Sequence, residues 1–193
     1  MLTDLQLKKL PKMFALNDNN GDGVIAQEDF EEAARTLAYL RGLAPGTAEY
    51  QDMHKTIMSR WNHIRETCDA DGDNRVTLKE WLAYWDKVLA TEGEYERVGK
   101  PFSVVVARTL DRDGDGKISP KEYTQWVSRW GVDEKAALDC FARLDLNGDG
   151  HLSVDEFVTL VAEYFQSSDP SSPGNWLLGP LEARLSSAQS AKR

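Results

Sequence analysis

Four segments of the chain carry oxygen-bearing side chains at a spacing that suits a hard divalent cation. Each is twelve residues long, and they begin at Asp18, Asp69, Asp111 and Asp145. Every segment has Asp or Asn at its third and fifth positions, Ile, Val or Leu at the eighth, and an acid at the twelfth. Calcium takes about 6–8 oxygen ligands, which such a loop supplies from positions 1, 3, 5, 7, 9 and 12. The pattern therefore predicts four calcium-binding loops, numbered here 1 to 4 in chain order.

Loops 3 and 4 meet every requirement of such a site. Position 12 is Glu, which is long enough to bind with both oxygens, and position 6 is Gly, where the chain turns sharply at positive φ. Position 7 contributes its backbone carbonyl, so its side chain is unrestricted. The predicted ligands are Asp111, Asp113, Asp115, Lys117, Ser119 and Glu122 in loop 3, and Asp145, Asn147, Asp149, His151, Ser153 and Glu156 in loop 4.

Loop 2 departs from the pattern at position 6, where Asn74 replaces Gly. Asn is the residue that best tolerates the left-handed backbone region after Gly. We therefore predict that loop 2 is a working site. Its predicted ligands are Asp69, Asp71, Asp73, Arg75 through its carbonyl, Thr77 and Glu80.

Loop 1 departs furthest. Ala26 at position 9 offers no ligand, and position 12 is Asp29, one methylene shorter than Glu. A shorter arm favours binding through one oxygen and a lower coordination number, which is closer to the octahedral geometry of magnesium. The sequence therefore predicts calcium or magnesium in loop 1, held by Asp18, Asn20, Asp22, Val24 through its carbonyl, and Asp29.

Helices must position these loops, because apolar residues recur at helical spacing on both sides of each one, as in Leu7, Leu10 and Phe14 before loop 1. A helix–loop–helix unit cannot bury its apolar face alone, so the units should pair. We predict an all-α fold of four EF-hands in two pairs packed into one compact globule, with short β-pairing between loops. The predicted regions are an N-terminal EF-hand pair in 1–92, a C-terminal pair in 100–167, a docked tail in 168–181, and a disordered end in 182–193.

Two breaks interrupt the helices outside the loops. Arg41-Gly-Leu-Ala-Pro-Gly46 separates the first two units. Between the halves, the sequence indicates a break near Thr91–Gly93 and Gly99–Pro101, with Pro101 in the first turn of the next helix.

The tail carries an apolar cluster outside the helical repeats, formed by Trp176, Leu177, Leu178 and Leu181. These side chains would be costly to leave in water, so we predict that they fold back onto the body. One interpretation places them in the groove of an EF-hand pair as a built-in competitor for target helices. The other is that they pack elsewhere as structural cover.

Composition excludes several classes. A formal net charge of −9 argues against nucleic acid as a partner, and the chain has no apolar run of the roughly 18 residues that a membrane helix needs, which predicts no stable membrane anchor. Cys68 and Cys140 match no zinc or redox spacing and read as reduced cysteines of a cytoplasmic protein. No nucleophile–base motif occurs, so we predict a non-enzymatic protein. We also predict that it is a monomer.

The chain resembles the invertebrate sarcoplasmic calcium-binding protein family, and most closely its calexcitin-like members. The resemblance rests on Trp61-Asn-His-Ile64, Trp81-Leu-Ala-Tyr-Trp85-Asp-Lys and Ser-Pro-Gly174-Asn-Trp-Leu-Leu-Gly179, together with the acid at Asp29. It implies two EF-hand pairs packed face to face with the tail tucked in, and calcium and magnesium buffering or neuronal signalling. Calexcitin-like chains have a degenerate fourth loop, whereas loop 4 is intact here. The chain also resembles coelenterate luciferin-binding proteins and photoproteins.

Three functions remain open at this point. A buffer or compact calcium-signal modulator needs only a fixed core. A sensor of an unidentified target protein needs a Met-rich groove that opens with calcium, and the only methionines are Met1, Met13, Met53 and Met58. A carrier of a small aromatic ligand such as a luciferin would use the tryptophan-rich interior as a pocket.

Overall fold

The computed structural model describes residues 1–181, so the prediction of a disordered end at 182–193 lies outside the described residues. The described chain is mostly helical with short strands in the loops, which confirms the predicted fold class. The elements are α1 (Asp4–Ala15), β1 (Val24–Ile25), α2 (Gln27–Arg41), α3 (Ala48–Cys68), β2 (Val76–Thr77), α4 (Leu78–Ala90), α5 (Glu94–Leu110), β3 (Lys117–Ile118), α6 (Pro120–Val127), η1 (Ser128–Trp130), α7 (Glu134–Leu144), β4 (Leu152–Ser153), α8 (Val154–Gln166) and η2 (Pro173–Trp176).

These elements form two compact units. The N-terminal unit contains residues 13–85, with loops 1 and 2. The C-terminal unit contains residues 1–12 together with the described chain from Asp86 onward, with loops 3 and 4 and the tail. Helix α1 therefore lies mainly in the unit of the second loop pair, although it precedes loop 1 in sequence.

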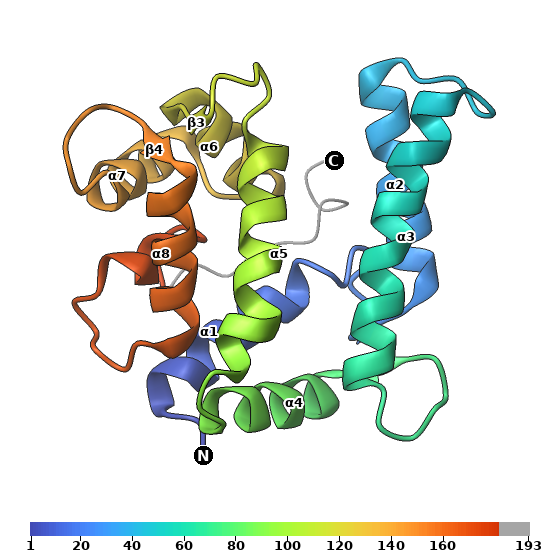
Figure 1. Ribbon diagram of the computed structural model, residues 1–193, viewed down its shortest axis with the longest axis horizontal. Helices are drawn as coiled ribbons and strands as arrows, with labels where there is room; N and C mark the ends of the chain where they lie inside the picture. The colour runs from blue at the N-terminus through green and yellow to red at the C-terminus, as the bar shows by residue number, and fades with distance from the viewer. Residues whose placement is uncertain (182–193) are drawn as a thin grey trace. The chain divides into compact units, whose positions relative to one another are not determined.

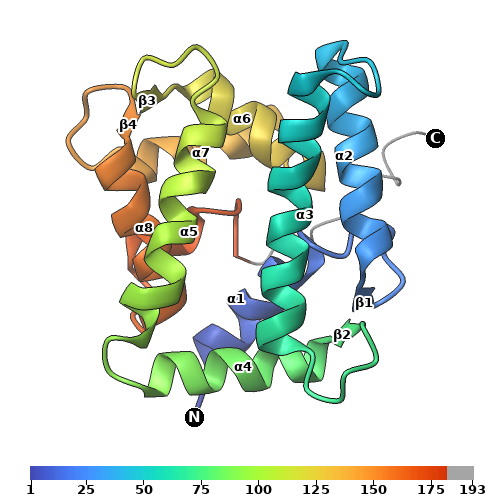
Figure 2. The same cartoon turned by 45° about the vertical axis from the view of Figure 1, so that its right-hand side comes forward.

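In the N-terminal unit, α2 and α3 lie side by side as a helical hairpin (Figures 1 and 2). Gly42 ends α2 in the left-handed region at φ 63°, and the Thr47 hydroxyl oxygen accepts a hydrogen bond from the Tyr50 backbone to begin α3. This confirms the predicted break at residues 41–46.

Tryptophans fill the core of this unit. The Trp61 ring packs against Phe30 with centroids 5.8 Å apart, and Trp81 packs between Phe14 and Trp85 at 6.3 and 5.8 Å. All three tryptophans are buried. Aromatic pairs at these separations contribute about 0.5–1.5 kcal/mol beyond their buried area. Trp61, Trp81 and Trp85 are thus part of the packed core of this unit.

In the C-terminal unit, α5 and α8 lie side by side (Figure 1). The buried face of α5 is narrow because three small residues, Gly99, Ser103 and Ala107, follow Tyr95 at four-residue spacing. The Tyr95 ring covers Gly99 so closely that a Cβ there would lie 2.4 Å from a ring carbon. The neighbouring Val105 is exposed, because it falls outside this stripe.

The predicted start of α5 at Pro101 is wrong. The helix begins at Glu94, after Gly93 at φ 75°, and Pro101 lies in its interior. A proline there removes one hydrogen bond of the helix, a cost that packing of the flanking residues offsets. The buried face shared by Tyr95, before the proline, and Ser103, after it, keeps the helix continuous.

The buried face of α1 is partly polar. Gln6, Lys9, Leu10 and Met13 are buried at helical spacing, whereas Leu7, which the apolar pattern placed inside, is 46% exposed. Lys9 is only 1% exposed. Lys9 is accommodated on this face because its Nζ atom donates hydrogen bonds to the Ser167 carbonyl and to the Asn175 side chain.

That tail folds back onto the same unit. The turn η2 packs on α8 and α7. Leu177 and Leu178 are each 1% exposed, and Trp176 and Leu181 are half-buried. Burying such side chains contributes roughly 1.5–3 kcal/mol each when complete.

Candidate calcium sites

Short antiparallel strands align the loops in pairs. β1 pairs with β2, which sets Ile25 opposite Val76, and β3 pairs with β4, which sets Ile118 opposite Leu152 (Figure 2). These are the residues at position 8, and each is completely buried. The apolar eighth position therefore anchors each loop to its partner and to the core, while the acid at position 5 is exposed in all four loops.

The first aspartate of each loop organises the turn around itself. In loop 3 the Asp111 Oδ1 atom accepts hydrogen bonds from the backbone nitrogens of Gly114 and Asp115 at 2.7 and 3.1 Å, and Oδ2 accepts from Gly116 at 2.9 Å. Bonds from positions 4 and 6 recur in the other loops at Asp18, Asp69 and Asp145. The loop backbone is thereby curled around one carboxylate in all four segments.

The acid at position 12 closes the loop. In loop 3, Glu122 Oε1 accepts from the Arg112 nitrogen at 2.6 Å, and Oε2 accepts from the backbone nitrogen and hydroxyl of Ser119, both at 2.8 Å. Burial opposes ionisation of this carboxyl, but these hydrogen bonds outweigh it and lower the pKa of Glu122. In Glu80 of loop 2, hydrogen bonds likewise outweigh the effect of burial and lower the pKa. Both groups are therefore carboxylates at neutral pH, ready to bind a cation.

The loops bring the predicted ligands together. One carboxylate oxygen from each of Asp69, Asp71 and Asp73 lies within 4.8 Å of the other two, and the same holds for Asp111, Asp113 and Asp115. In loop 1 and loop 4, loop backbone nitrogens donate to the corresponding side chains in the same way; these are Asp18, Asn20 and Asp22, and Asp145, Asn147 and Asp149. A set of carboxylate, amide, hydroxyl and carbonyl oxygens fits a hard cation such as calcium and suits soft metals poorly.

Loop 1 differs at its closing acid. Asp29 is buried, and burial raises the pKa of its carboxyl despite hydrogen bonds from the backbone nitrogens of Ala26 and Asn20 at 2.8 and 3.1 Å. In loops 2 and 3 the Glu at position 12 accepts from the nitrogen of position 2, at Ala70 and Arg112. The shorter arm of Asp29 therefore still closes loop 1 through backbone nitrogens of the loop.

Asn74 adopts the conformation predicted for it. Its φ is 62°, and it is the one non-glycine residue with positive φ in the part of the chain that the structure describes. The Asn74 nitrogen donates to Asp69 Oδ2 at 2.9 Å, as the glycine at this position does in the other loops. The substitution thus preserves the shape of loop 2.

Sequence reasoning missed the role of the side chains at position 7. The Lys117 Nζ atom lies 3.5 Å from Asp149 Oδ2, and an Arg75 guanidinium nitrogen lies 3.9 Å from Asp22 Oδ2. In both cases a basic residue at position 7 of one loop reaches the acid at position 5 of its partner. The sequence does show a basic residue at position 7 of loops 2 and 3. Its contact with the partner loop could not be predicted without the register in which the paired strands align.

The comparisons with known proteins agree with this geometry. A family model described as an EF-hand domain pair matches residues 108–162. Calerythrin of Saccharopolyspora erythraea is 26% identical over 85% of this chain and 94% of its own length, and the sarcoplasmic calcium-binding protein alpha-B and -A chains of Penaeus sp. are 27% identical over 86% and 90%. The luciferin-binding protein of Renilla reniformis is 25% identical over 91% and 94%.

Among solved structures, a sarcoplasmic calcium-binding protein from amphioxus superposes with a TM-score of 0.77, covering 93% of this chain and 99% of that one at 22% identity. The fold and the loops define an EF-hand calcium-binding protein. Within that class, the chain is similar to the sarcoplasmic calcium-binding proteins. Across residues 1–181, none of its helices combines the length and the apolarity needed to cross a bilayer.

Proposed function

We propose that this protein is a cytoplasmic calcium buffer, or a compact calcium-signal modulator, that binds four divalent cations. Loops 2, 3 and 4 take calcium, and loop 1 takes calcium or magnesium. The chain acts as a monomer without catalytic chemistry, with one EF-hand pair in residues 1–92 and the other in 100–167. The observation that carries the proposal is the tail, which occupies the apolar face of the C-terminal unit where a sensor would bind its target.

The tail is held by hydrogen bonds to two helices that follow calcium loops. Glu163 in α8 accepts from the Ser172 hydroxyl at 2.8 Å and from the Gly174 nitrogen at 2.9 Å. Tyr123 in α6 donates to the carbonyl oxygens of Trp176 and Leu177 at 3.0 and 3.2 Å. A sensor opens by changing the angle between the two helices of one EF-hand, such as α7 and α8, and the η2 turn of the tail packs on both of these. A tail attached to both of them supports a fixed arrangement.

Two further contacts extend this attachment. The Arg143 guanidinium of α7 lies over the Trp176 ring, 4.2 Å from its centroid. Gly179, at φ 81°, approaches Val132 so closely that a Cβ would lie 2.8 Å from a methyl carbon. The tail therefore contacts α6, α7, α8 and the connection between α6 and α7.

Helix α1 closes over the tail from its polar face. Gln6 donates to the Phe165 carbonyl at 3.1 Å and Lys12 to the Pro180 carbonyl at 2.7 Å. Between them, Lys9 donates to the Ser167 carbonyl at 2.9 Å and to Asn175 Oδ1 at 3.0 Å. Three donors at three-residue spacing satisfy backbone groups that would otherwise be buried without partners. Such a closed unit favours buffering over target binding.

The experiment that tests this proposal is calorimetric titration of calcium with and without millimolar magnesium. A buffer of this kind should bind four calcium ions, with at least one site weakened when magnesium competes. Four sites that are indifferent to magnesium, accompanied by calcium-dependent binding of amphipathic peptides, would favour a sensor.

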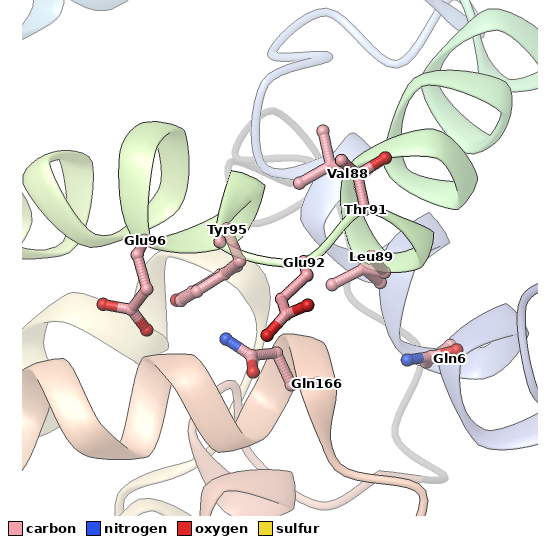
Figure 3. Close-up of a pocket in the computed structure, with 9 residues that line it drawn as sticks. Gln6, Val88, Leu89, Thr91, Glu92, Tyr95, Glu96 and Gln166 are labelled. Atoms are coloured by element: carbon pink, nitrogen blue, oxygen red, sulfur yellow. The ribbon is translucent and has the colours of Figure 1, made fainter.

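A second candidate, carriage of a small aromatic ligand, is favoured by the relative from Renilla reniformis, which is named for binding luciferin. One pocket of about 310 Å³ lies in the C-terminal unit (Figure 3). Its lining is mainly polar, with Gln6, Thr91, Glu92, Glu96 and Gln166 beside Val88, Leu89, Gly93 and Tyr95. Sites for apolar ligands are lined mostly by hydrophobic and aromatic side chains. This pocket therefore gives the carrier role little support, and tryptophan quenching by an added luciferin would test it.

A further inference from the structure

The two loop pairs share a charge arrangement that ligand geometry does not require. In each pair, one loop has Arg or Lys at position 7 and the other does not: Arg75 in loop 2 corresponds to Val24 in loop 1, and Lys117 in loop 3 corresponds to His151 in loop 4. Each basic side chain reaches across to the acid at position 5 of the partner loop, Asp22 or Asp149. The basic side chain of loop 2 therefore contacts loop 1, and the basic side chain of loop 3 contacts loop 4.

The contact with Lys117 involves one carboxylate oxygen of Asp149 and leaves the other bonded within its own loop. Asp149 Oδ1 accepts from the His151 nitrogen at 3.0 Å, while Oδ2 faces Lys117. The strand register makes this possible, because Lys117 pairs with Ser153 in the β3–β4 ladder. The ammonium group therefore stands beside a ligand set without belonging to it.

We propose that Lys117 and Arg75 are internal counter-cations that set the divalent-cation affinity of loops 4 and 1. Without calcium, the basic group offsets the mutual repulsion of the loop carboxylates and stabilises the cation-free form. With calcium bound, the same positive charge lies close to a divalent ion and destabilises the bound form. Both effects lower affinity, so each pair contains one loop that its partner weakens.

This inference rests on the proposal that the loops bind calcium. A nearby charge and a change in the ligands themselves are expected to affect calcium and magnesium binding differently. A positive charge repels calcium and magnesium alike, so removing it should raise both affinities and leave their ratio unchanged. Its effect should also fall with salt, because both side chains are exposed and the screening length is about 10 Å at 0.1 M. A change in a ligand arm, by contrast, would alter the ratio.

The test compares three variants of the full chain by calcium titration. Lys117→Gln removes the charge, Lys117→Arg keeps it, and Lys135→Gln removes an exposed charge from α7 in the same unit. The amide signals of Gly116 and Gly150 report loops 3 and 4 separately, because these nitrogens donate to Asp111 and Asp145. We expect Lys117→Gln to tighten calcium binding in loop 4 by about threefold at 10 mM salt, and by much less at 0.5 M. Lys117→Arg and Lys135→Gln should stay near wild type.

The corresponding pair in the N-terminal unit is Arg75→Gln with Lys55→Gln as control, read at the Gly23 amide. Equal loop 4 affinities in wild type and Lys117→Gln at 10 mM salt would overturn the proposal, and so would an equal gain from Lys135→Gln. If the wild-type loops do not titrate with calcium at all, the proposed function itself fails, which is a distinguishable result.

Discussion

The backbone nitrogen of Gly174 donates a hydrogen bond to the Glu163 carboxylate over 2.9 Å, which brings the tail backbone directly against α8. A Cβ at residue 174 would lie 2.5 Å from the Leu160 carbonyl oxygen and 2.6 Å from the Glu163 Cβ. The main chain of the helix cannot move away from a methyl group there without disturbing its own hydrogen bonds. The tail thus depends on a residue without a side chain at this point of contact.

Gly174→Ala should therefore loosen the tail. We expect a loss of about 1–3 kcal/mol in the free energy of unfolding, because overpacking forces backbone shifts. Thermal and urea unfolding in saturating calcium would measure it, with the exposed Ser168→Ala as the control. Wild-type stability in Gly174→Ala would mean that the tail is not docked against α8.

The closing acid of loop 1 offers a test of cation selectivity. Asp29→Glu restores the longer arm, so we expect it to raise the calcium affinity of loop 1 relative to its magnesium affinity. The Gly23 amide would report this site in parallel titrations with the two ions. If the ratio of affinities is the same in the variant as in wild type, position 12 does not set selectivity in this loop.

Lys9 gives the fold a distinctive pH dependence. Burial lowers its pKa from 10.5 to about 8, although the nearby Glu163 carboxylate opposes the shift. Because the folded pKa lies below the unfolded one, the unfolded chain holds the proton more tightly between pH 8 and 10.5, and the contribution of Lys9 to stability rises with pH across this window.

Lys9→Met removes this titration and leaves the Ser167 carbonyl and the Asn175 amide oxygen without their donor. We therefore expect wild type to gain about 2 kcal/mol in unfolding free energy relative to Lys9→Met between pH 7 and pH 10. Urea unfolding at both pH values would measure the change, with Lys135→Met as an exposed control in the same unit. A gap that stays constant or narrows would contradict the buried position of Lys9.

Calcium should close this protein rather than open it. We expect the dye ANS to fluoresce less with calcium than without it, because the cation-free loops repel their own carboxylates and loosen the core. Truncation after Ser168 should reverse this order by exposing the face that Leu177 and Leu178 cover. A large calcium-dependent rise in the full chain would instead favour the sensor alternative.

The loops and their flanking helices could be predicted from the sequence because their determinants are local. A twelve-residue ligand spacing, a left-handed position filled by Asn74, and an apolar eighth residue act within one turn of chain. The helical hairpin of α2 and α3 was predictable for the same reason, because Gly42 and Thr47 are local cap residues.

Features that depend on distant contacts could not be predicted. The buried Lys9 is explained only by the Ser167 carbonyl and Asn175, more than 150 residues away. Pro101 resembles a helix start, but Tyr95 and Ser103 bury the same face on either side of it. The reach of Lys117 to Asp149 follows from the β3–β4 register, which no single loop specifies.

The most direct test of the account is native mass spectrometry of the full chain at saturating calcium. Three loops with complete ligand sets, together with loop 1, which lacks only the ligand at position 9, predict four bound ions. Asp29→Asn, Glu80→Gln, Glu122→Gln and Glu156→Gln should each weaken one site selectively. Loop 1 should be the first to empty as calcium is lowered. Two or fewer ions in the wild-type protein would contradict the central claim that each of these loops is a cation site.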